Sequence, residues 1–220
     1  MIALSSLDRA EAVRYLGGAG IALDERMNAL LDDCEHELLR TIDAKYLYKL
    51  VDLPCEPLMR GEDIRAHLEG CSRAAVMCAT LGAGVDRLLR VSQIADMSRA
   101  VVLDSLAAAA IEQVCDEVEQ RIAAGFPGQY LTFRFGPGYG DYPLSIQKHL
   151  LRLLDAPRKI GLSLNDSLLL TPTKSVTAVI GLSDLPIPRR KRGCAVCSLR
   201  ETCAYRRKGS HCGFENTASE

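Results

Sequence analysis

The sequence predicts an α+β protein in which long helices pack on a mostly antiparallel sheet, with a small Cys-rich metal-binding tail. Helical patterns fill the first part of the 220 residues and strand patterns come later, an order that favours α+β over regular alternation. Four of the nine cysteines gather near the C-terminus. A hydrophobic content of 48% over this length is sufficient for one buried core. We therefore expect a main domain over residues 1–188 and a basic, Cys-rich tail over residues 189–220.

Helical periodicity accounts for much of the first 125 residues. An acidic turn after two serines, ended by two glycines, predicts a short helix within residues 5–18. Apolar residues recur at spacings of three and four over 23–42, which predicts a long helix. After a proline-containing loop at 52–61, residues 62–68 are predicted to be helical. The same spacing extends over 97–124, so we expect the longest helix there.

Strand patterns become frequent after this helix. Residues 130–135 alternate polar and apolar, and 176–182 follows 167–170 across a Thr-Pro-Thr-Lys turn. Earlier in the chain, the short apolar run 74–81 predicts a buried strand, and a helical pattern follows it. Ser145 is predicted to cap a helix that continues to Leu154. Together these segments predict a sheet covered by helices.

The first 188 residues contain neither an export signal nor a membrane span by these patterns. Residues 1–13 carry Asp8 and Glu11 in place of a basic and apolar leader, and the longest apolar run, 101–111, contains Asp104. We therefore expect a cytoplasmic protein with no membrane partner. Thiols stay reduced in the cytosol, so we expect no disulfide framework, and five dispersed cysteines are interpreted as small buried side chains. These are Cys34, Cys55, Cys71, Cys78 and Cys115.

The four remaining cysteines have a spacing typical of metal ligands. They are Cys194, Cys197, Cys203 and Cys212, in the pattern Cys-x2-Cys-x5-Cys-x8-Cys. Four thiolates this close in sequence can surround one centre without help from the rest of the fold. Structural zinc usually uses two Cys-x2-Cys pairs, whereas this tail has one, and its first three cysteines resemble the start of the auxiliary-cluster motif of SPASM-type domains. The pattern favours a 4Fe-4S cluster over zinc, with His211 as an alternative fourth ligand.

Positive charge is concentrated in the tail. Residues 189–212 hold eight Lys or Arg against one Glu, whereas residues 1–188 hold 19 basic and 25 acidic residues. Such asymmetry marks an interaction surface and leaves two interpretations open. One is an acidic redox partner that docks near a cluster, and the other is a metal-stabilised nucleic-acid-binding or adaptor protein. Few aromatic residues accompany the charges, only Tyr205 and Phe214, so nucleic acid is the less favoured partner.

A glycine-rich segment after the strand pattern at 130–135 has the composition of a ligand loop. It reads Arg134-Phe135-Gly136-Pro137-Gly138-Tyr139-Gly140-Asp141-Tyr142-Pro143. Glycine leaves backbone amides accessible and proline fixes one dihedral angle, while arginine offers a planar fork to a carboxylate. On chemistry alone, a tight turn with tyrosines packed on its flank explains the segment as well. No Ser/His/Asp site competes with it, since the four histidines lie in unrelated segments.

The order Arg-x-x-Pro-Gly-Tyr at 134–139, followed later by Ser175-Val176-Thr177, resembles the S-adenosylmethionine-binding activation domain of B12-dependent methionine synthase. The resemblance covers about residues 95–183. It implies that the arginine binds the methionine carboxylate of S-adenosylmethionine and that the tyrosine and loop backbone contact the nucleoside. The implied ligand residues are Arg134, Gly136, Pro137, Gly138, Tyr139, Gly140 and Tyr142, together with Glu112 of the long helix.

Two features depart from that family. The loop continues as Gly-Asp-Tyr-Pro at 140–143 where the family has Pro-Ala-Cys-Pro, and the family's amino-group-binding aspartate has no assigned counterpart. A competing pattern at 79–86 resembles the first glycine loop of Rossmann-type methyltransferases. It lacks the third glycine and the surrounding alternation of strands and helices, so a Rossmann-type nucleotide-binding loop is not expected there.

The resemblance implies a function for the chain. In that family, a corrinoid that has been oxidised to Co(II) regains its methylated state by taking one electron and a methyl group from S-adenosylmethionine. The 220 residues contain no cobalamin, folate or homocysteine module, so we expect the corrinoid to belong to a partner, either a corrinoid protein or a B12-dependent methyltransferase. The chain would contribute the position of the methyl donor and no nucleophile or base.

Overall fold

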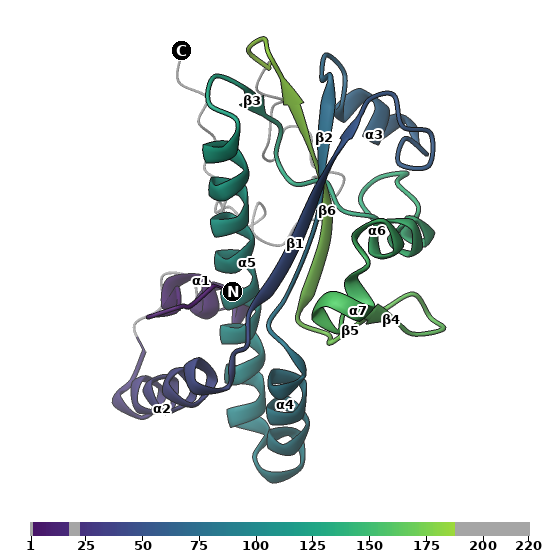
Figure 1. Ribbon diagram of the computed structural model, residues 1–220. Coiled ribbons are helices and arrows are strands. Elements are labelled where there is room, and N and C mark those ends of the chain that lie inside the picture. Colours follow the sequence, from purple (N-terminus) through teal and green to yellow (C-terminus); the bar gives the residue numbers. More distant parts are fainter. Residues whose placement is uncertain (1, 18–22, 188–220) are drawn as a thin grey trace, which may run out of the picture. The chain divides into compact units, whose positions relative to one another are not determined.

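The computed structural model describes residues 2–17 and 23–187 (Figure 1). The helices are α1 (Arg9–Tyr15), α2 (Glu25–Thr41), α3 (Glu62–His67), α4 (Ala83–Ala95), α5 (Met97–Gly125), the short 3-10 turn η1 (Leu144–Ile146), α6 (Gln147–Leu154) and α7 (Ala156–Ile160). The strands are β1 (Lys45–Asp52), β2 (Arg73–Thr80), β3 (Tyr130–Leu131), β4 (Ser163–Leu164), β5 (Leu170–Thr171) and β6 (Ser175–Ser183).

The main sheet has the strand order β1-β2-β6-β3, and every neighbouring pair is antiparallel. β1 pairs with β2 over its full eight residues, from Lys45 opposite Thr80 to Asp52 opposite Arg73. β4 and β5 form a separate two-stranded hairpin. The α+β class with a mostly antiparallel sheet is therefore confirmed.

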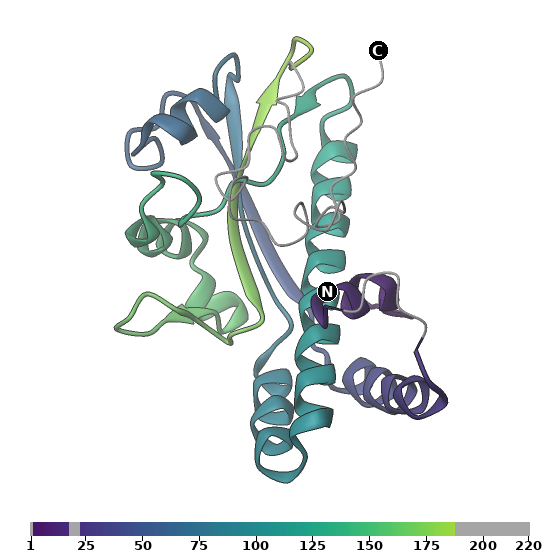
Figure 2. The same ribbon diagram turned by 180° about the vertical axis from the view of Figure 1, so that it is seen from behind.

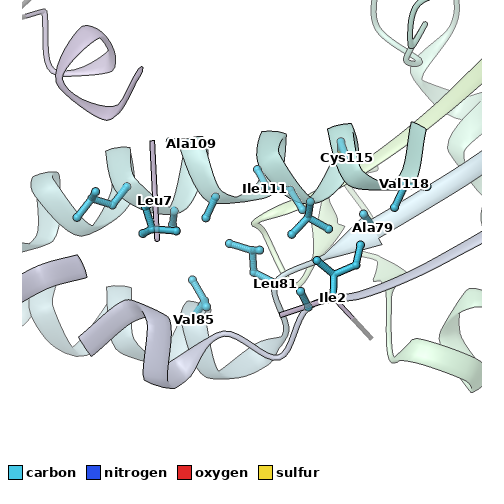
Figure 3. Packing of buried hydrophobic residues seen from close by; sticks show 14 of the residues in the cluster. Ile2, Leu7, Ala79, Leu81, Val85, Ala109, Ile111, Cys115 and Val118 are labelled. Atoms are coloured by element: carbon cyan, nitrogen blue, oxygen red, sulfur yellow. The ribbon is translucent and has the colours of Figure 1, made fainter. Parts of the chain in front are cut away.

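The two faces of the sheet cover two different cores. Odd-numbered residues of β2, from Ala75 to Ala79, belong to the first core, and even-numbered residues, from Ala74 to Cys78, belong to the second. α1, α2, α4 and α5 lie on the side of the first core, while α3, α6 and α7 lie on the other side of the sheet (Figure 2). Figure 3 shows Ala79 of β2 in the first core with Cys115 and Val118 of α5.

α5 is the main element of the first core, because it contacts α1, α2, α4 and the sheet. The Asp96 side chain caps its N-terminus by accepting the backbone N–H groups of Ser98 and Arg99 at 2.9 and 3.2 Å. Thirteen of its residues are buried, at helical spacing along one broad face. Its opposite side is left free for the charged residues that form the candidate site.

A β-bulge separates β3 from the glycine-rich segment. Leu131 lies opposite Leu182 of β6 and Phe135 lies opposite Val179, so four steps along this segment match three steps along β6. Thr132 N–H still donates to Gly181 O at 2.9 Å, so the extra residue interrupts the ladder between Thr132 and Phe135. The predicted strand over 130–135 is therefore wrong in its extent, since β3 ends at Leu131.

The helices predicted from periodicity are confirmed, as are the strands predicted at 74–81 and 176–182. Ser145 does not cap a helix: a 3-10 turn comes first, and α6 begins after Ile146 without a side-chain cap. The sequence prediction leaves out β1, whose two faces are both partly buried, so that apolar residues do not alternate with polar ones.

In residues 2–17 and 23–187, the helices are all too short or too polar to cross a membrane. The predicted tail, 189–220, with its four clustered cysteines, lies outside the described residues.

Candidate functional site

Alternate side chains of the bulged segment point to opposite sides of the sheet. Phe133 and Phe135 pack on His67 of α3, with ring centroids 4.4 and 4.8 Å from the imidazole centroid. Arg134 lies between them in sequence and reaches α5 instead. The bulge therefore anchors the segment in the second core while it directs one guanidinium to the other face.

Arg134 forms ion pairs with three carboxylates of α5. Its Nη2 lies 2.9 Å from Glu112 Oε2, and its Nη1 lies 2.7 Å from Asp116 Oδ1 and 3.1 Å from Glu119 Oε1. Positions 112, 116 and 119 share one face of a helix, so a single guanidinium can meet all three. We call these four residues the Arg134 cluster. Glu112 was predicted from the sequence, whereas the other two acids were not.

The Arg134 side chain is only 21% exposed, and it remains charged. Burial on its own lowers the pKa of the guanidinium, but the hydrogen bond to Asp116 and the charge of Glu119 raise this pKa above its usual value. The three ion pairs use the two Nη atoms, and Nε has no partner among the described residues. One edge of the guanidinium is thus available to a carboxylate ligand.

Space for a ligand lies next to the Arg134 cluster. An open hollow of about 360 Å³ borders Asp116, between α5 and the N-terminal residues 2–4. Tyr15 of α1, a helix that packs on α5, is close enough to Glu112 to be affected by its charge. Partial burial, the hydrogen bond to Glu11 and the charges of Glu11 and Glu112 raise the pKa of Tyr15 to about 12. A larger hollow, of about 540 Å³, lies between α6 and the β4–β5 hairpin, and the predicted ligand residues do not line it.

The glycine-rich segment that follows Arg134 folds into a compact turn. Gly138 N–H donates to Tyr142 O at 2.8 Å, and Tyr139 N–H donates to Gly136 O at 3.2 Å. The φ angles of Gly138 and Gly140 are +97° and +52°, a left-handed region that favours glycine. The turn holds Tyr139 with 69% of its surface exposed, so a large aromatic ring is available to an incoming ligand.

The turn is tied to α3 by two aspartates. Asp141 accepts the backbone N–H groups of Glu62 and Asp63 at 2.6 and 3.0 Å, and Asp63 in return accepts the N–H of Asp141 at 3.1 Å. α3 has Gly61 at its N-cap and no cap from its own side chains, so Asp141 supplies the missing acceptor. We call this arrangement the reciprocal cap. Sequence reasoning missed it, although a helix that starts without a capping side chain is a sign of one.

Tyr142 lies beneath the turn. It is 1% exposed, belongs to the second core and stacks near Phe135, with ring centroids 5.8 Å apart. Burial, and then the charge of Cys55, raise the pKa of its phenol, whose buried hydroxyl has no hydrogen-bond partner in the described part of the chain. The sequence prediction counted Tyr142 among the ligand residues, whereas the structure buries its ring in the second core.

The other predicted residues of the segment support the turn through their backbone. Gly136 lies close to β6: a Cβ atom there would be 3.2 Å from Thr177 O. Thr177 belongs to the Ser-Val-Thr stretch at 175–177, so the structure brings the two parts of the sequence motif together. Pro137 lies between Gly136 and Gly138 within the turn.

The predicted metal ligands, Cys194, Cys197, Cys203 and Cys212, lie outside the described residues. Within the described ranges, no group of three or more His, Cys, Asp or Glu side chains is placed to hold a metal ion. The five dispersed cysteines are free thiols, of which Cys34, Cys78 and Cys115 are buried. Burial raises the pKa values of Cys78 and Cys115 to about 12, as expected for unreactive core side chains.

Comparison with known proteins places the loop and the Arg134 cluster within one family region. Residues 72–184, just over half of the 220, match the family described as the vitamin B12-dependent methionine synthase activation domain. A crystal structure of the MetH reactivation domain bound to AdoHcy aligns with a TM-score of 0.63 at 15% identity, over 94% of this chain and 82% of that chain. At this identity, the likeness concerns the fold. Among curated proteins, no relative matches.

Proposed function

Because the chain belongs to the activation-domain family of vitamin B12-dependent methionine synthase, we propose that it reactivates an oxidised corrinoid on a partner protein by presenting S-adenosylmethionine as the methyl donor. The observation that carries this proposal is the ion pairing of Arg134 with Glu112, directly before the Gly136–Gly140 turn in sequence and inside the matched region. The AdoHcy in the solved relative is the demethylated form of that donor, which supports the proposal.

The Arg134 cluster matches the charges of S-adenosylmethionine. The carboxylate of the donor would bind the available Nε edge of Arg134. Its ammonium and sulfonium groups are cationic and would be attracted to Glu112, Asp116 and Glu119. Tyr139 would stack on the adenine, and the backbone of Gly136, Pro137, Gly138 and Gly140 would line the nucleoside.

The reaction depends on where the methyl donor is held and needs no acid or base catalyst. The cobalt of the partner's corrinoid takes up one electron and the methyl group, and the sulfur keeps the bonding pair as S-adenosylhomocysteine leaves. No proton is transferred in this step. The chain would therefore hold the sulfonium near the cobalt face, and a rigid turn serves this purpose. Tyr142, buried under the turn, would contribute to its rigidity.

Calorimetric titration with S-adenosylmethionine tests this assignment. Arg134→Ala should weaken binding by about 1.5 to 3 kcal/mol, roughly 10- to 150-fold, as expected for the loss of a charge-assisted hydrogen bond. Arg158→Ala is a matched control, because it removes an exposed arginine that pairs with Asp155 on the other side of the sheet. Equal affinity in the wild type and Arg134→Ala would refute the site. Absence of binding in the wild type would favour the adaptor or nucleic-acid-binding function.

We also propose that the tail, 189–220, is a separate metal-binding unit, with Cys194, Cys197, Cys203 and Cys212 as ligands. A 4Fe-4S cluster there would supply the electron, received from a redox partner. Anaerobic purification should then yield about four iron atoms per chain, and Cys197→Ser should remove them while Cys115→Ser does not. One zinc per chain without iron would leave the tail a structural clamp. Deletion of 189–220 should preserve S-adenosylmethionine binding.

A further inference from the structure

β1 is a long edge strand whose outer side has no strand partner among the described residues. It pairs with β2 alone, and the next strand of the sheet lies beyond β2. In Figure 1, β1 crosses the front of the sheet and no described helix lies before it. The eight residues contain neither proline nor glycine, and Tyr48 is 39% exposed. An open, regular edge of this kind is a template for pairing with another strand.

The register of β1 identifies which backbone groups point outward. Leu53 N–H donates to Ser72 O at 3.0 Å, and these two residues continue the β1–β2 register. In an antiparallel ladder, backbone groups alternate between the two sides of a strand, so odd-numbered residues of β1 bond to β2. The N–H and C=O groups of Tyr46, Tyr48 and Leu50 therefore point away from the sheet.

We propose that this edge pairs with β1 of a second copy of the chain, antiparallel about a two-fold axis at Tyr48. A two-fold axis between antiparallel strands is perpendicular to the sheet, so opposite residues must share a face. Centring the axis on Tyr48 places Tyr46 opposite Leu50 on both sides and Tyr48 opposite itself. These three pairs have outward backbone groups, and each exchanges two N–H···O bonds.

The charges of β1 and the length of the pairing together favour this register. In the chosen pairing, Lys49 lies opposite Leu47 and Lys45 lies opposite Val51, so like charges do not face each other. Shifting the axis by one residue, to Lys49, places two lysines directly opposite in a closely spaced pair, and like charges in such a pair are destabilising. Aromatic and aliphatic pairs on the face of Tyr46 and Tyr48 stabilise the first register. Axes at Tyr46 or Leu50 also avoid opposed like charges, but they pair fewer residues of the strand than the axis at Tyr48, which pairs residues 45–51.

Sedimentation of the full chain over a concentration series tests the proposal. The wild type should sediment as a dimer that dissociates on dilution. Tyr48→Lys places two positive charges at the axis and should raise the dissociation constant at least about tenfold. Tyr130→Lys is the matched control, because Tyr130 is an exposed tyrosine of the opposite edge strand, β3, at 47% exposure. It should leave the dimer intact.

Amide exchange of the wild type gives a second readout that needs no variant. The outer amides of Tyr46, Tyr48 and Leu50 should be protected at high concentration and lose protection on dilution, while those of Leu47 and Lys49 stay protected throughout. A monomer at all concentrations would overturn the proposal, as would a dimer that survives Tyr48→Lys. Protection of the outer amides in a monomer would show that another segment of the same chain occupies the edge, and would also overturn it.

Discussion

The segment of Arg134 and the glycine-rich turn makes different kinds of contact on the two sides of the sheet. On the α5 side, Arg134 meets three carboxylates that are between 32% and 60% exposed, so the contacts are ionic and open to solvent. On the α3 and α6 side, Phe135 and Tyr142 are buried, and the reciprocal cap fixes the backbone. One side thus carries the exposed charges of the candidate site, and the other holds the turn in place. Changes on the second side should affect folding and binding together, whereas changes on the first should affect binding alone.

The largest effect is expected from Gly140→Ala. The new Cβ atom would lie 1.9 Å from Asp63 Oδ2, at a φ of +52°, so the Asp63 side chain would have to move and give up the hydrogen bond that it accepts from Asp141 N–H. We expect a loss of at least about 2 kcal/mol in the free energy of unfolding and loss of S-adenosylmethionine binding. Urea denaturation and calorimetry measure the two effects.

Gly128→Ala is the control for the backbone strain alone. Gly128 also has a positive φ, +86°, but a Cβ atom there meets nothing within 4 Å. It should cost about 1 kcal/mol and leave binding intact. Equal stability losses in the two variants would show that the contact with Asp63 has no part in holding the turn.

Asp141→Ala removes one half of the reciprocal cap without adding atoms. The backbone N–H groups of Glu62 and Asp63 lose their acceptor, and we expect the free energy of unfolding to fall by about 1 to 2 kcal/mol. S-adenosylmethionine affinity should fall with it, because the turn is no longer attached to α3. Asp166→Ala, in the β4–β5 hairpin, should change neither quantity, and a similar loss there would argue against a specific cap.

Glu112→Gln should act on binding and leave folding nearly unchanged. It weakens one ion pair of Arg134 and removes a negative charge facing the cationic donor, so we expect about a tenfold loss of S-adenosylmethionine affinity. Glu37→Gln is a close match, since Glu37 pairs with Arg99 and is 43% exposed against 45% for Glu112. If Glu112→Gln and Glu37→Gln lose affinity equally, the loss comes from the change in net charge, and the Arg134 cluster does not contact the ligand.

The smallest effect is expected from Tyr142→Phe. The buried hydroxyl has no hydrogen-bond partner among residues 2–17 and 23–187, so its removal should leave the free energy of unfolding at pH 7 unchanged or raise it by up to about 1 kcal/mol. Because burial raises the phenol pKa in the folded state, the unfolded state ionises first above about pH 10 and the wild type loses stability there. The variant should lose less between pH 9 and 11, as measured by urea denaturation. A steeper loss in the variant would contradict the buried, neutral phenol.

Much of the fold could be predicted from periodicity, and part of the site from a motif. α2 and α5 have long apolar stripes, β2 is apolar on both faces, and β6 has apolar residues at alternate positions, so local sequence was sufficient for them. β1 was missed because partial burial on both faces removes the alternation that marks a strand. Arg134 and Glu112 were found through their resemblance to a family, but the contact between them depends on the bulge, which aligned residues alone do not reveal.

The remaining parts of the site depend on tertiary contacts. Asp116 and Glu119 follow Glu112 at helical spacing and were within reach of sequence reasoning once the helix was known. Asp141 and Asp63 are 78 residues apart, and the local sequence around either residue does not predict contact with the other. The burial of Tyr142 likewise follows from its position over the second core, since tyrosine is as common at ligand surfaces as in interiors.

The reciprocal cap also limits how the turn can change or be transferred. Gly61 and Gly140 lie on the two sides of the reciprocal cap. A Cβ atom at position 61 would lie 2.6 Å from Asp141 Oδ1, and a Cβ atom at position 140 would clash with Asp63. The two positions are therefore coupled, and a substitution in either segment constrains what the other tolerates. An engineer who grafts residues 134–143 onto another scaffold would have to carry α3 with them. The transferable unit is the turn together with the helix start that it caps.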